Sequence, residues 1–242
     1  MLFGGWIPFL VALAIAGLAG LLRGVTGFGS SLVLAPVLSI ILGPVEAIAI
    51  TLLIGISASV FLVPRYLSDY DRDVVLPLSL AGIAFLIPGV LSLSLLPAET
   101  TRHVIACVMI AITLLMQLPH IALRKSRWQC AVAGALGGLI MGATSMGGPP
   151  LVLYLTGQRP DPRQLKANIV VTVGALELAA LVAIAFLQRI DITTFVQFAM
   201  LLPGFLLATH LAEQASGTIV GRTYQYIIFA LLLATGIAAL AF

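Results

Sequence analysis

Arg23 and Glu177 are charged residues set in apolar sequence, and they are the residues best suited to chemistry. Arg23 follows Gly20-Leu21-Leu22, and Glu177 lies between Leu176 and Leu178. A planar guanidinium can bind two oxygens of one anion at once, unless the side chain extends to the membrane surface instead. The buried carboxyl group of Glu177 can carry a proton, pair with Arg23 or face a polar gap between helices. We therefore expect an anion site at Arg23 and a coupling or pairing role for Glu177.

The segment around Arg23 occurs twice. Residues 18–29 align without a gap on residues 136–147, so that Leu, Gly, Leu, Gly, Thr and Gly recur 118 positions apart. Gly-interrupted apolar segments at matching places in two halves are typical of transporters whose site lies between the repeats. The candidate substrate-binding residues are Arg23, Gly24, Thr26, Gly27, Gly29, Ser30, Ser31, Thr51, Gly142, Thr144, Ser145, Gly147, Gly148 and Asn168. The glycines of this set are expected to supply positive φ angles at two helix breaks, where the amides of the next helix can bind an anion.

The polar groups of these segments allow two interpretations each. Thr26 and Thr144 occupy equivalent positions, and each hydroxyl either binds the anion or donates back to a helix carbonyl. Thr51 and Asn168 follow the breaks, and each either faces a cavity or forms a hydrogen bond between helices. The residue equivalent to the arginine is Met141, so the two breaks are expected to be related but unequal.

Composition indicates a membrane protein. Of the 242 residues 61% are hydrophobic and 9% are charged, whereas soluble domains carry about 25% charged residues. The net charge of +3 is small and the basic residues form short clusters, which argues against nucleic-acid binding. Cys107 and Cys130 lie in separate apolar stretches without the spacing of a disulfide framework or a metal site. We expect no cofactor and no metal.

The apolar sequence divides into ten segments. They are residues 6–22, 30–42, 45–63, 74–95 and 102–122, then 130–145, 149–157, 165–187, 193–213 and 222–242. A full span needs about 20 residues at 1.5 Å each, so the second segment of each half should be a half-helix. Pro149 and Pro150 suit the first turn of such a helix, because proline has no N–H to satisfy there.

The basic residues predict the topology. If each break returns the chain to the side it came from, nine of the twelve basic residues lie in inner loops, as the positive-inside rule requires. These loops are 64–73, 123–129, 158–166 and 214–222. The prediction is an all-α polytopic membrane protein with both termini outside. Two inverted repeats, residues 1–123 and 124–242, each contain a Gly-rich helix break followed by three transmembrane helices in one integrated domain.

The order of residues at the breaks also resembles a known family. The first break reads GLLRGVTGFGSSLVLAP over residues 20–36, and the second reads GLIMGATSMGGPPLVL over residues 138–153. This order, with the length and the two-half layout, resembles the TauE/SafE family of sulfite and sulfonate exporters. The chain departs from the family's pattern at Gly29-Ser30-Ser31, where a run of glycines is usual, and at Tyr154, the equivalent of Pro36. The resemblance implies export of sulfite, sulfoacetate or another organosulfonate across a bacterial inner membrane.

The leading interpretation is a secondary transporter that works by alternating access, with protons as a candidate coupling ion. A passive channel, or a transporter for another small organic anion, is the alternative. A remote alternative is an intramembrane hydrolase with Ser145 as nucleophile and His210 as base. The sequence contains no Walker motif, which argues against direct use of ATP by this chain. The expected partners are a small anion and the lipid bilayer, and a homodimer is compatible with the sequence.

Overall fold

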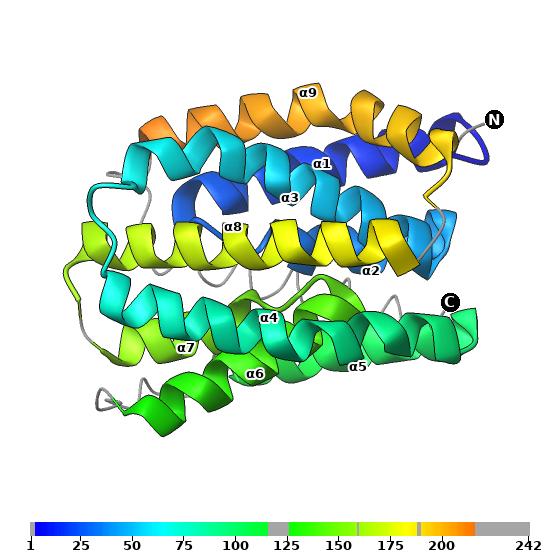
Figure 1. The fold of residues 1–242 in the computed structure, drawn as a ribbon. Coiled ribbons are helices and arrows are strands. Elements are labelled where there is room, and N and C mark those ends of the chain that lie inside the picture. The colour runs from blue at the N-terminus through cyan, green and yellow to red at the C-terminus, as the bar shows by residue number, and fades with distance from the viewer. Residues whose placement is uncertain (1–2, 116–125, 159, 188–189, 216–242) are drawn as a thin grey trace.

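The computed structural model describes residues 3–115, 126–158, 160–187 and 190–215, and within these ranges it is all-helical (Figure 1). The helices are α1 (Trp6–Thr26), α2 (Ser30–Leu42), α3 (Pro44–Tyr66), α4 (Arg72–Leu95), α5 (Ala98–Leu115), α6 (Arg127–Thr144), α7 (Gly148–Gly157), α8 (Pro162–Leu187) and α9 (Ile192–Ala215). The short predicted segments correspond to α2 and α7, which have 13 and 10 residues. The last predicted segment, 222–242, lies outside the described residues.

Five of the described helices are long and apolar enough to cross a membrane, namely α1, α3, α4, α8 and α9. Large apolar side chains such as Phe186 and Leu95 are 87% and 80% exposed, as expected of surfaces that face lipid. All backbone polar groups of a helix interior are satisfied within the helix, which suits it to the hydrocarbon core. The chain therefore has the length and composition of a multi-pass membrane protein.

Local sequence accounts for several helix starts. Pro44 opens α3 and Pro149 lies in the first turn of α7, where a residue without an N–H leaves no donor unsatisfied. Asp71 precedes α4, and its carboxylate accepts a hydrogen bond from the backbone N–H of Asp73.

Glycines allow the closest helix contacts. A Cβ atom on Gly20 or Gly24 of α1 would overlap with carbonyl oxygens of α9, and one on Gly138 or Gly142 of α6 would overlap with carbonyl oxygens of α4. Glycines of α1 therefore pack it closely against α9, the last described helix, and glycines of α6 pack it closely against α4. Close contact through small residues is a common way for helices to associate in membranes.

The expected positive φ angles are only partly correct. Gly27 and Gly29 adopt them, with φ of 81° and 88°. Gly24 and Gly142 instead lie inside helices, where they provide room for a neighbouring helix. Gly147 has φ of −71°, and a Cβ there would overlap with the carbonyl oxygen of Gly137. The close approach of these two backbone segments therefore explains the glycine at this position. Gly148, likewise without a positive φ, is the first residue of α7.

Ser145 takes the left-handed position at the second break, with φ of 60°, although glycines follow two residues later. It caps the end of α6, and its N–H donates to the carbonyl of Met141. A left-handed non-glycine residue costs roughly 1–2 kcal/mol, so the surrounding packing must hold this turn in place.

Helices α3 and α8 cross in the middle of the described bundle. Gly55 of α3 lies against Glu177, whereas Ser59 and Val63 lie against Gly174, so the two helices run in opposite directions. In Figure 1, α8 runs alongside α3 and α4, with α1 and α9 beyond α3 and with α6 beyond α4. The side chains of Arg23 and Glu177 meet at this crossing.

Candidate functional site

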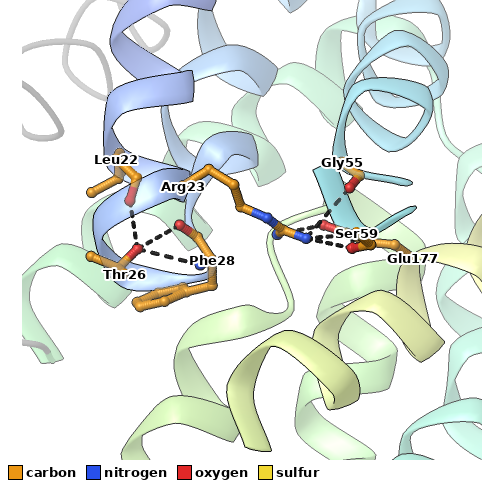
Figure 2. Close-up of polar contacts among 7 residues, drawn as sticks. All are labelled: Leu22, Arg23, Thr26, Phe28, Gly55, Ser59 and Glu177. Carbon is orange, nitrogen blue, oxygen red and sulfur yellow. Dashed lines mark hydrogen bonds and ion pairs between the residues drawn. The ribbon is translucent and has the colours of Figure 1, made fainter. Parts of the chain in front are cut away.

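Arg23, in the last turn of α1, reaches the crossing of α3 and α8 and pairs with Glu177 (Figure 2). Its Nη1 donates to Oε1 at 2.8 Å and its Nη2 donates to Oε2 at 2.9 Å. The side chains of Arg23 and Glu177 are 1% and 4% exposed. Arg23 therefore points into the protein, and the guanidinium holds two oxygens of one carboxylate.

Two residues of α3 complete this network. Arg23 Nη2 donates to Ser59 Oγ at 2.7 Å and lies 3.4 Å from the carbonyl oxygen of Gly55. Ser59 Oγ in turn donates to Glu177 Oε2 at 2.9 Å. Gly55 leaves room for this approach, because a Cβ there would lie 2.6 Å from Glu177 Oε1. Three helices thus supply one bidentate ion pair and a hydroxyl that bridges it.

Ser59 and Gly55 were missed by the sequence reasoning, although the sequence contains a signal for them. Ser59 and Glu177 are 118 residues apart, which is the offset of the repeated segment. Extending the repeat alignment would have paired these two positions, and Gly55 lies one helical turn before Ser59 on the same face of α3.

Burial makes the charge pair costly. Each ion loses its hydration, and mutual attraction in a low-dielectric interior offsets that loss without a large surplus. Arg23 Nε makes no hydrogen bond within the described part of the chain, so one donor of the guanidinium remains unused. An intramembrane ionisable pair of this kind is by default a candidate functional site rather than a source of stability.

The two repeated threonines have the same structural role. Thr26 Oγ1 lies 2.8 Å from the carbonyl oxygen of Leu22 and accepts from the N–H of Phe28. Thr144 Oγ1 donates to the carbonyl of Ile140 at 2.8 Å, and it accepts from the N–H two residues later. Each hydroxyl therefore closes the end of its helix, which is the back-bonding alternative rather than a free ligand group.

Three other candidate hydroxyls are buried without a hydrogen bond in the described residues. They belong to Ser30 at the start of α2, Ser145 at the second break and Thr51 on α3, each 1% exposed. A buried polar group without a partner is costly and requires an explanation, such as a bound water, ion or ligand. These hydroxyls remain predicted substrate contacts, whereas Ser31 lies half-buried on α2.

The two breaks lie against each other. A Cβ atom on Gly148 would be 3.0 Å from the ring of Phe28, so the first break contacts the start of α7. A Cβ atom on Gly27 would be 2.8 Å from Val170 and 3.6 Å from Lys166, both on α8. The first break therefore contacts both the start of α7 and the first turns of α8. Gly27 follows Arg23 by four residues at the end of α1, whereas Val170 precedes Glu177 by seven residues on α8.

Asn168 forms a hydrogen bond at the start of α4, away from the Arg23–Glu177 pair. Its Oδ1 accepts a hydrogen bond from the N–H of Asp71 at 2.7 Å, which joins α8 to the start of α4. The side chain of Asn168 is therefore a connection between helices, the second of the two alternatives open from the sequence.

Ser145 and His210, the residues of the hydrolase alternative, do not form a hydrogen bond with each other in the described residues. His210 packs edge-on against Phe61, and its Nε2 lies 2.9 Å from the amide nitrogen of Gln214. The Ser145 hydroxyl makes no hydrogen bond within the described ranges. Among those same residues, no group of three or more His, Cys, Asp or Glu side chains is placed to hold a metal ion.

A protein-family model and a bacterial relative indicate the same family for this chain. The protein-family model described as sulfite exporter TauE/SafE matches residues 12–239. A protein of Cupriavidus necator named "probable sulfite/organosulfonate exporter TauE" is 23% identical over 237 residues, covering 95% of this chain and 93% of that protein. No solved structure gives a significant match.

Proposed function

Because this chain belongs to the TauE/SafE family of sulfite exporters, we propose that it is a secondary transporter that exports a small sulfur-containing anion. The match extends over nearly the whole chain, and the bacterial relative carries sulfite and organosulfonate in its name. The proposed substrates are sulfite, sulfoacetate or another organosulfonate, and the proposed location is a bacterial inner membrane.

The helix contacts support inverted repeats and alternating access. In the proposed repeats α1 corresponds to α6, α3 to α8 and α4 to α9. The contact of α1 with α9 then corresponds to that of α6 with α4, and the contact of α4 with α8 corresponds to that of α9 with α3. All four contacts are present. The antiparallel crossing of α3 and α8 maps onto itself, and Ser59 and Glu177 meet there. A rotation axis near this contact would relate the halves, which is the arrangement that lets one half rock against the other around a fixed site.

The observation that carries the proposal is the bidentate geometry at Arg23. The guanidinium holds two oxygens of a carboxylate at 2.8 and 2.9 Å. A sulfite or sulfonate group presents two oxygens in a comparable way, so it can replace the Glu177 carboxylate on the same donors. We propose that the substrate anion and Glu177 compete for Arg23.

This competition suggests how protons could be coupled to transport. An anion on Arg23 next to an ionised Glu177 would place two negative charges on one cation, which a neutral, protonated Glu177 avoids. Proton and anion would then bind together and move in the same direction. If Glu177 stays ionised, the anion moves as net charge and the membrane potential drives its export.

Ligand-induced thermal stabilisation of the detergent-purified protein tests the proposal. Sulfite, sulfoacetate, taurine, isethionate, thiosulfate and acetate are compared, because preferential binding to the folded state raises the melting temperature. We expect stabilisation by at least one sulfur oxyanion, none in Arg23→Ala and an intermediate effect in Arg23→Lys, which keeps the charge but loses the two-pronged geometry. Equal stabilisation of the wild type and Arg23→Ala would refute the role of Arg23.

A further inference from the structure

Lys166 lies over the first helix break. It belongs to the first turns of α8, and its Cγ is 3.6 Å from where a Cβ atom on Gly27 would be. Its Nζ donates to the carbonyl oxygen of Gly24 at 2.8 Å and lies 5.5 Å from the centre of the Tyr66 ring. The ammonium group therefore contacts the last turn of α1, one residue after Arg23.

The acceptor of Lys166 differs from those of the basic residues nearby. Arg23 donates to Glu177, Arg65 to Glu213 and Arg163 to Asp69, so each of these guanidinium groups contacts a carboxylate. The ammonium of Lys166 donates to a neutral carbonyl. The carboxylate that acts on it electrostatically is Glu213, which binds Arg65 directly.

We propose that Lys166 is a second anion-binding residue of the transport site, a role that rests on the proposed export of an oxyanion. A charged oxygen is a stronger acceptor for an ammonium group than a neutral carbonyl oxygen. A small oxyanion at the break therefore replaces the Gly24 carbonyl as the acceptor of the Lys166 hydrogen bond. Lys166 is half-buried whereas Arg23 is fully buried, so an anion that enters from the surface would meet Lys166 before Arg23. The anion then passes to Arg23, the residue before Gly24, whose carbonyl no longer accepts a hydrogen bond from Lys166.

Three variants separate this role from a structural one, with sulfoacetate as the probe in equilibrium binding. Lys166→Gln keeps a donor for the Gly24 carbonyl but removes the charge, and we expect binding about tenfold weaker with little change in melting temperature. Lys166→Arg should stay within about threefold of the wild type, because the charge is kept. Arg163→Gln is the matched control, since it removes one charge from the same helix at a side chain that is 71% exposed.

Chemical labelling of the wild-type protein tests the same role if Lys166→Gln fails to fold. The chain contains two lysines, Lys125 and Lys166, so Lys125 is an internal reference for acylation by an amine-reactive ester. We expect saturating sulfoacetate to slow the modification of Lys166 relative to Lys125 at least fivefold, as measured by mass spectrometry.

The outcomes distinguish this inference from the proposed function. If the wild type binds sulfoacetate and Arg23→Ala does not, but Lys166→Gln binds as tightly as the wild type, the role of Lys166 is wrong and the proposed function stands. An equal loss in Arg163→Gln, or modification of Lys166 that the anion leaves unchanged, also overturns it. If no sulfur oxyanion binds the wild type, both proposals fail.

Discussion

Replacing Glu177 with glutamine tests the buried charge pair, because the change keeps the size of the side chain and removes its charge. Arg23 would then be a cation 1% exposed to solvent without a counter-charge. Removing one partner of a buried pair costs about 3–5 kcal/mol, and we expect the lower end because the amide oxygen of glutamine still accepts from Arg23. At about 2–4 °C per kcal/mol for a chain of this size, the melting temperature should fall by roughly 6–12 °C.

The double variant Arg23→Met with Glu177→Gln isolates the interaction between the charges. Methionine is the residue at the equivalent position of the second half, Met141, and the double variant buries no charge at this site. We expect it to recover all but about 1–2 kcal/mol of the stability, since replacing both members of a buried pair is often neutral. Thermal unfolding of the four proteins in one detergent gives the coupling energy. A double variant as unstable as the sum of the single ones would show that the two charges do not stabilise one another.

Three further predictions concern the packing of Gly55, the membrane topology and the coupling role of Glu177. Gly55→Ala would put a methyl group 2.6 Å from Glu177 Oε1 and should lower the melting temperature by several degrees, whereas Gly17→Ala, with nothing within 4 Å, should not lower it. Single cysteines at Ser126 and Asp161, in a background without the native cysteines, should react with an impermeant reagent only from the cytoplasmic side, and labelling from outside would contradict the topology. In proteoliposomes, Glu177→Gln should make sulfoacetate flux independent of an imposed pH gradient while exchange at equal pH persists. A wild-type response to the gradient would leave Glu177 as a structural partner only.

Helix positions could be predicted because apolar runs and proline are local signals. The predicted segment 30–42 has the bounds of α2, and the predicted segment 149–157 starts one residue after α7 does. Pro149 lies in the first turn of α7, as expected from its missing N–H. Topology relative to a membrane, by contrast, depends on the loop charges and remains a prediction.

The roles of the repeated glycines could not be separated from sequence alone. Gly24 and Gly27 are three residues apart, yet one provides room for α9 and the other has a positive φ. The difference depends on which distant helix approaches, and α9 begins more than 160 residues later in the chain. Likewise, the sequence allows Arg23 and Glu177 to pair, but only the approach of the last turn of α1 to α8 brings the two side chains within hydrogen-bonding distance.

The most direct test of the account is uptake of labelled sulfoacetate or sulfite into proteoliposomes that contain either the wild type or Arg23→Ala at equal, folded amounts. The account predicts saturable uptake by the wild type that unlabelled sulfur oxyanions inhibit, and background uptake by Arg23→Ala. Arg163→Gln, which removes an exposed charge, should transport like the wild type. Equal saturable uptake by the wild type and Arg23→Ala would contradict the claim that the anion binds at the buried arginine.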